Sequence, residues 1–80
     1  MHSKQLRRKM KIEIQEDINL ALRKLPSGRV AKRRAFKPGE SHNVEFLGED
    51  CDLETISFQF ESGYCALNVP RRAVAVTSVD

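Results

Sequence analysis

The chain has 80 residues, of which 40% are hydrophobic and 31% are charged, and its formal net charge is +3. A chain of this length removes only about 60% of its unfolded surface from water, so we expect one small domain without a deep catalytic cleft. No apolar run approaches the roughly 18 to 20 residues of a membrane-spanning helix, and no signal-peptide core follows the basic N-terminus. Two cysteines are too few for a disulfide framework. These features predict a cytoplasmic protein without a membrane partner.

The first nine residues read as a flexible basic arm, and residues 10–80 as a small β domain. Residues 11–15 alternate apolar and polar side chains, which predicts a strand with Ile12 and Ile14 on one face. Because this pattern starts directly after Met10, a natural start at Met10 is a further hypothesis.

Residues 16–25 fit two patterns. Ile18, Leu20 and Leu22 alternate as in a strand, but the same segment also fits a helical face with Asp17 as its N-cap. We favour the strand because the preceding residues alternate in the same phase. A turn at 26–28 then leads to an extended segment at 29–36, either an edge strand or a long irregular loop, whose basic side chains would discourage edge-to-edge aggregation.

The second half of the chain has stronger strand signals. We expect a turn at 37–40, a strand at 43–47 with Val44 and Phe46 on one face, an acidic loop at 48–52, a strand at 55–60, a tight turn at 61–63, and strands at 64–69 and 73–79. In the strand at 55–60, the buried side should carry Ile56, Phe58 and Phe60. Short strands at about ten-residue intervals are typical of a mostly β, curled antiparallel sheet.

The order of these elements resembles the second half of an SH3-like barrel. The resemblance covers about residues 35–77 and rests on the turn Lys37-Pro38-Gly39-Glu40, the strand Val44-Glu45-Phe46-Leu47 and the segment from Gly63 to Val76. It implies an antiparallel barrel in which the strand ending at Val69-Pro70 enters one turn of 3₁₀ helix and then a final short strand. The chain has no Trp, one Tyr, and Ala73 where the family commonly has an aromatic residue. A groove for proline-rich peptides is therefore not expected.

Residues for catalysis or metal binding are sparse. His42 is interpreted as an exposed histidine just after a turn, and Cys65 as a packed thiol. No spacing demands a Ser/His/Asp or Cys/His arrangement, so no enzyme is expected. Neither His42 with Cys51 and Cys65 nor the acidic stretch matches a zinc or calcium pattern, so no metal or other cofactor is expected.

The charge distribution is the most informative feature. Residues 1–37 contain twelve basic and three acidic residues, a net charge of +9, whereas residues 38–80 have a net charge of −6, with seven acids between Glu40 and Glu61. Segregated charges of this kind steer the docking of partners with complementary potentials. The chain is therefore predicted to be a small protein–protein interaction module, a regulator or adaptor.

Two sets of residues are predicted to contact the partner. The basic set is Arg7, Arg8, Lys9, Lys32, Arg33, Arg34, Arg71 and Arg72, and the acidic set is Glu49, Asp50, Asp52 and Glu54. The alternative hypothesis is a nucleic-acid-binding barrel that uses the basic arm and first half of the chain. Single-strand binders stack bases on exposed aromatic rings, and only Phe36 and Tyr64 are candidates for that role. The sequence leaves the oligomeric state open.

Overall fold

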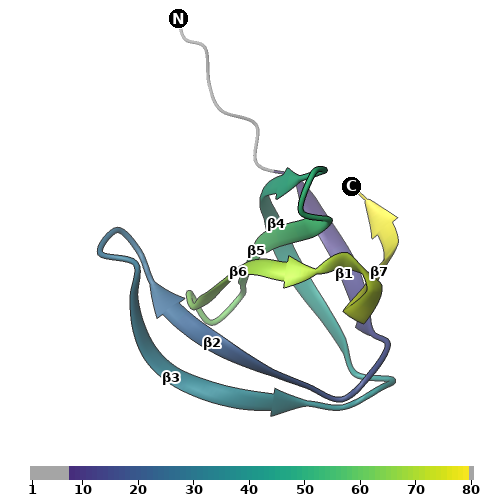
Figure 1. The fold of residues 1–80 in the computed structure, drawn as a ribbon, viewed down its shortest axis with the longest axis horizontal. Helices are drawn as coiled ribbons and strands as arrows, with labels where there is room; N and C mark the ends of the chain where they lie inside the picture. The colour runs from purple at the N-terminus through teal and green to yellow at the C-terminus, as the bar shows by residue number, and fades with distance from the viewer. Residues whose placement is uncertain (1–7, 80) are drawn as a thin grey trace, which may run out of the picture.

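The structure, a computed structural model, describes residues 8–79 and is built from strands. They are β1 (Lys9–Ile14), β2 (Ile18–Lys24), β3 (Arg29–Phe36), β4 (Ser41–Asp50), β5 (Thr55–Phe60), β6 (Cys65–Pro70) and β7 (Val74–Val79), with a 3₁₀ turn, η1 (Arg71–Ala73), before β7 (Figure 1). The prediction of a mostly β fold is confirmed.

The strands form one antiparallel sheet in the order β3-β2-β6-β5-β4-β1-β7. The sheet does not close into the predicted barrel, and β3 and β7 are its two edges. The β2–β3 hairpin joins the other strands through a single paired position, Arg23 opposite Cys65. It therefore diverges from β6 and curves away from the other strands at the lower left of Figure 1. The resulting sheet is strongly bent, with a hollow beside the hairpin.

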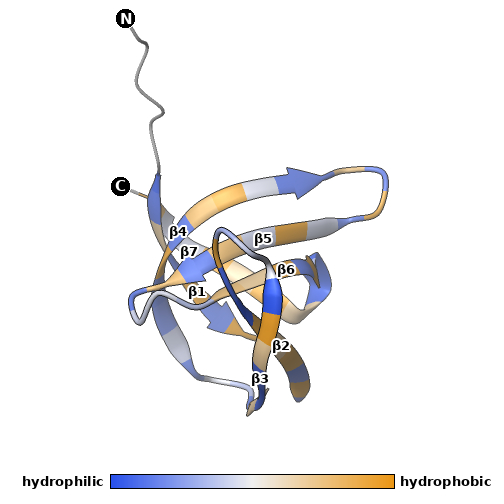
Figure 2. Ribbon diagram, turned by 90° about the vertical axis from the view of Figure 1, so that its left-hand side faces the viewer, coloured by the Kyte–Doolittle hydropathy of each residue, from blue (hydrophilic) through white to orange (hydrophobic). Residues whose placement is uncertain are grey.

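The core lies inside this bend and follows the alternation of the sequence. Ile12 and Ile14 of β1 are fully buried, and every second residue of β5 is buried, as predicted. Figure 2 shows the corresponding bands of hydrophobic and hydrophilic residues along β4 and β5. The buried cluster consists of Met10, Ile12, Ile14, Leu20, Leu22, Phe36, Val44, Ile56, Phe58, Phe60, Ala66, Val69 and Val74.

The ambiguous segment at 16–25 is a strand, as favoured. β2 pairs with β3 from Ile18 opposite Phe36 to Lys24 opposite Arg29, with a bulge after Leu22. β3 is an edge strand, and only Phe36 among its eight residues is buried. The weak alternation of β3 is explained by this position, because a strand with two exposed faces has little need of apolar side chains.

Two boundaries differ from the predictions. The acidic loop expected at 48–52 is mostly strand, since β4 continues through Asp50, which pairs with Thr55, after a bulge that follows Phe46. The turn itself spans residues 51–54. At the N-terminal end, the sheet includes Lys9, which was assigned to the arm, and Arg8 O accepts a hydrogen bond from Phe46 N. Residues 1–7 of the predicted arm lie outside the described residues.

The turns before β3, before β4 and between β5 and β6 occur where the sequence predicts them. Gly39 and Gly63 have φ angles of 95° and 100°, a region that side-chain-bearing residues rarely adopt. Pro70 ends β6, and η1 follows directly before the last strand. This strand–3₁₀–strand order is the local arrangement that the SH3-like resemblance implies.

Candidate binding surfaces

The β2–β3 hairpin concentrates positive charge. Residues 18–36 contain six basic residues and no acid. Only Arg34 forms an ion pair with a carboxylate of the described residues, Glu40. Arg23 donates a hydrogen bond to the carbonyl oxygen of Gly28, in the turn of the hairpin. The six basic residues are Arg23, Lys24, Arg29, Lys32, Arg33 and Arg34.

The inner face of this hairpin lines a hollow that we call the concave groove, with a volume of about 410 Å³. Its other walls come from the start of β4 and from the β5–β6 turn. The lining residues are Leu22, Lys32, Arg34, Phe36, Ser41, His42, Asn43, Phe60, Glu61, Ser62 and Tyr64. The groove thus combines cations with aromatic rings.

Tyr64 is the aromatic residue most accessible from this groove. Its ring lies 5.1 Å from Lys24 Nζ and 4.7 Å from Lys32 Nζ, measured to the ring centroid. Phe36, the other predicted candidate for base stacking, is only 1% exposed and belongs to the core. That prediction is therefore wrong for Phe36, because its ring closes the hairpin against β5.

His42 is not the exposed turn histidine that the sequence predicted. It lies in β4 with its side chain 24% exposed, and its ring packs edge-on against Phe36 and Phe60 at centroid distances of 5.5 and 5.4 Å. The stacked rings of Phe36 and Phe60 form the adjacent wall. β4 begins at Ser41, before the start expected at residue 43, and His42 is therefore part of the strand.

Glu40 connects three segments beside the groove. Its carboxylate accepts a hydrogen bond of 2.8 Å from the Lys37 backbone N–H, and it contacts His42 Nε2 at 3.1 Å and Arg34 Nη2 at 3.3 Å. The Lys37 N–H, with smaller contributions from His42 and Arg34, holds the pKa of the Glu40 carboxyl below its usual value. Sequence reasoning missed this cluster. The Glu-x-His spacing on an alternating strand was the only available signal.

The acidic set lies at the tip of the β4–β5 hairpin, away from the β2–β3 turn (Figure 1). Glu49 Oε1 lies 3.6 Å from Arg71 Nη1, so a predicted acidic contact and a predicted basic contact pair with each other. Asp50 accepts a hydrogen bond from the Leu53 N–H within the turn. Asp52 and Glu54 carry no side-chain hydrogen bond or ion pair within residues 8–79 and remain available to a partner.

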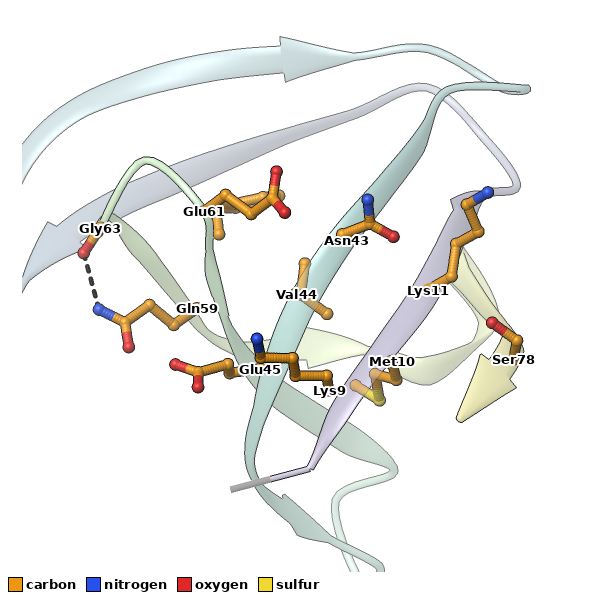
Figure 3. Close-up of a pocket in the computed structure, with 11 residues that line it drawn as sticks. Lys9, Met10, Lys11, Asn43, Val44, Glu45, Gln59, Glu61, Gly63 and Ser78 are labelled. Carbon is orange, nitrogen blue, oxygen red and sulfur yellow. Dashed lines mark hydrogen bonds between the residues drawn. The ribbon is translucent and has the colours of Figure 1, made fainter. Parts of the chain in front are cut away.

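The other predicted basic residues do not form one surface. Arg72 Nε lies 3.5 Å from Glu16 Oε2, whereas Lys9 lines a shallow groove of about 800 Å³ across β1, β4 and β5 (Figure 3). Lys11, Glu45 and Glu61 also line this groove, so its charges are mixed. Arg7 lies outside the described residues.

A third hollow is mainly apolar and opens beside the edge strand β7. Its volume is about 620 Å³, and β7 contributes Val76 and Val79, which are 45% and 53% exposed. No residue of β7 is charged. The lining residues are Arg8, Met10, Phe46, Gly48, Glu49, Ile56, Arg71, Val76 and Val79.

The chemistry available to catalysis or metal binding is limited. Cys65 is buried, as predicted, and burial raises the pKa of its thiol. Cys51 is exposed and lies 3.7 Å from Glu49 Oε2. Within residues 8–79, no group of three or more His, Cys, Asp or Glu side chains could hold a metal ion. Over the same range, no helix has the length and hydrophobicity to cross a membrane.

Comparisons of the chain with protein-family models, with curated proteins and with solved structures give no match.

Proposed function

We propose that the protein is a non-catalytic nucleic-acid-binding module that uses its β2–β3 hairpin to contact phosphates. The observation that carries this proposal is the unbroken positive charge of residues 18–36. Five of the six cations, Arg23, Lys24, Arg29, Lys32 and Arg33, have no carboxylate partner within the described residues, and Arg23 is held by the Gly28 carbonyl oxygen. Free cations on one element release counterions when they neutralise phosphates, and this release drives sequence-independent binding.

The ion pairs elsewhere in the molecule are the reason for preferring nucleic acid over the two-signed protein interface. That interface would use an acidic surface and a basic surface whose charges are not already paired within the fold. Glu49 with Arg71 and Glu16 with Arg72 already pair within the fold. The β2–β3 hairpin, in contrast, has five cations without a carboxylate partner among the described residues and no acid of its own, which fits a polyanion.

The test is a salt titration of nucleic-acid binding by the full chain. A mixed-sequence single strand and its duplex would be labelled and titrated by fluorescence anisotropy from about 50 mM to 300 mM salt. We expect log Kd to rise linearly with log salt. The double reversal Lys32→Glu/Arg33→Glu should weaken binding more than tenfold, whereas Lys11→Glu, on the exposed side of β1, should change it less than threefold. The absence of measurable binding to either probe at about 50 mM salt would overturn the proposal.

Docking of a partner protein is the second candidate, and the β7 edge favours it. An uncharged edge strand beside an apolar hollow offers unpaired backbone groups to an added strand. The acidic residues Asp52 and Glu54 would then contact the same partner or a second one. A small regulator or adaptor would use both features.

The protein-docking candidate has its own test. Affinity capture after nuclease treatment should return one stoichiometric companion, and Val76→Lys, which places a charge at the edge, should release it. The Lys32→Glu variant should still capture the companion. If the Val76→Lys variant captures the companion and the Lys32→Glu variant does not, the companion binds the basic hairpin instead.

We further propose that the fold is an open relative of the SH3-like barrel, and that the basic residues among positions 1–7 add phosphate contacts as an N-terminal arm. The strand–3₁₀–strand order at residues 65–79 supports the first part. An experimental structure would test it. Deletion of residues 1–7, which include Lys4 and Arg7, should lower the salt slope of binding if the arm contributes.

A cytoplasmic location is proposed on the basis of the two cysteines, since neither forms a disulfide. Fractionation of cells that express the native protein would test it.

A further inference from the structure

The basic residues of the β2–β3 hairpin are divided between its two faces. Lys32 is paired with Leu22, whose side chain is buried inside the bend, so Lys32 points to the concave groove. Lys24 lies on that same face, two residues after Leu22. Arg33 is paired with Ala21 and therefore lies on the outer face.

The two lysines on the inner face share one aromatic partner, the Tyr64 ring. Both ammonium groups lie within 5.1 Å of the centroid of the Tyr64 ring, so they are within about 10 Å of each other. Neither forms an ion pair with a carboxylate of residues 8–79. Two like charges at this separation repel each other, and an anion that enters between them relieves that repulsion.

Two acids, Glu40 beside the concave groove and Glu61 in its lining, do not replace such an anion. Glu40 is already held by Lys37 N, His42 and Arg34. Glu61 lines the groove at the β5–β6 turn but forms no ion pair with either lysine. Its charge opposes an incoming anion, and its removal should favour binding.

The size and shape of the groove indicate which form of nucleic acid enters it. A hollow of about 410 Å³ is in the range of sites for single small ligands and accommodates about one nucleotide. A duplex, in contrast, would take the hairpin into its major groove as a two-stranded ribbon and would contact the outer face as well. Single-strand sites combine a positive groove with an aromatic ring for a base.

We infer that the concave groove is a single-strand subsite, in which Lys32 from its lining and Lys24 beside Tyr64 hold a backbone phosphate and Tyr64 packs against the adjacent base. This inference rests on the proposed function and assigns it to one face of the hairpin. Arg34 is a lesser contributor because Glu40 already neutralises it. The outer-face Arg33 does not contact the strand.

The experiment compares neighbouring residues on opposite faces. An oligo(dT) strand of about twelve nucleotides and a duplex of equal length would be titrated with wild type, Lys24→Gln, Lys32→Gln and the matched control Arg33→Gln. We expect each lysine variant to bind the single strand at least fivefold more weakly and to lower the magnitude of the salt slope by about 0.7. Arg33→Gln should change the affinity less than twofold.

Two further variants test the aromatic ring and the opposing acid. Tyr64→Leu should weaken single-strand binding about tenfold with an unchanged salt slope, because stacking involves no counterion release, and Tyr64→Phe should bind as wild type does. Glu61→Gln should bind about twofold more tightly. Circular dichroism would verify the fold of each variant.

The outcomes separate the inference from the proposed function. If Arg33→Gln weakens binding as much as Lys32→Gln, or if the duplex is preferred and Tyr64→Leu has no effect, the concave subsite is overturned while nucleic-acid binding stands. If wild type binds neither probe, both are overturned.

Discussion

The β2–β3 and β4–β5 hairpins are built alike but use their charges differently. Each is an antiparallel pair with one bulge, after Leu22 in the first and after Phe46 in the second. The β4–β5 hairpin lies in the middle of the sheet, between β6 and β1, and two of its four tip acids, Glu49 and Asp50, are engaged by Arg71 and by the turn backbone. The β2–β3 hairpin lies at the edge, and most of its cations have no carboxylate partner within residues 8–79. Part of the charge on the central hairpin is used within the fold, whereas most of the charge on the divergent hairpin remains available to a ligand.

The comparison implies that the β2–β3 hairpin depends on a few apolar anchors. Phe36→Ala removes the only buried side chain of β3 and should lower the free energy of unfolding by about 3–5 kcal/mol. Val30→Ala, at an exposed position of the same strand, should cost less than about 0.5 kcal/mol. Urea unfolding monitored by circular dichroism measures both values. Equal, small effects would indicate that backbone pairing alone holds the hairpin.

Glu40 should link stability of the hairpin junction to pH. Because its folded pKa is lowered, its contribution is present above the unfolded pKa near 4.5 and is lost as the pH falls through the folded value. Glu40→Gln should destabilise the protein by about 1 kcal/mol at pH 7. The difference from wild type should shrink in acid, as thermal unfolding between pH 3 and 7 would reveal. A constant difference across that range would mean that Glu40 acts without its charge.

The tip of β4–β5 contains a strained residue that a single substitution can relieve. Glu54 has a φ of 53°, in the left-handed region where side chains other than Gly and Asn are disfavoured. Glu54→Gly should raise the free energy of unfolding by up to about 1 kcal/mol, since the hydrogen bonds of Glu54 to Arg71 N and Cys51 O come from its backbone and survive the substitution. Urea unfolding would measure the gain. A loss of stability would show that the side chain has a partner in solution.

The acidic tip should have the smallest influence on nucleic-acid binding. Asp52→Lys changes the charge by two units, but at 0.15 M salt the Debye length is about 8 Å and the tip is remote from the concave groove. We expect less than a twofold change in Kd by anisotropy. A gain of tenfold would mean that the bound strand reaches the β4–β5 tip.

Local patterns predicted most of the strands, because each buried face repeats its apolar residues at a period of two. Ile56, Phe58 and Phe60 illustrate this, and all are buried. The end of β4 was missed because Glu49 and Asp50 are acidic residues with no apolar alternation, and only their pairing with Ile56 and Thr55 of β5 holds them in the sheet.

The candidate sites were less predictable than the fold. The basic character of residues 32–34 was apparent from the sequence. Whether Lys32 or Arg33 points into the groove, however, depends on which face of β3 is turned inward. The pairing of Arg71 with Glu49 and the position of Tyr64 beside Lys24 depend on tertiary contacts between separate strands. A single sequence provides no signal for such contacts.

The two cysteines provide a practical handle. Burial keeps the Cys65 thiol protonated and shielded, whereas Cys51 is exposed at the β4–β5 turn. A maleimide or an alkylating dye should therefore modify one position of the native chain. A fluorophore or spin label attached there would stand clear of the basic hairpin, so ligand encounters could be followed on the unmutated protein.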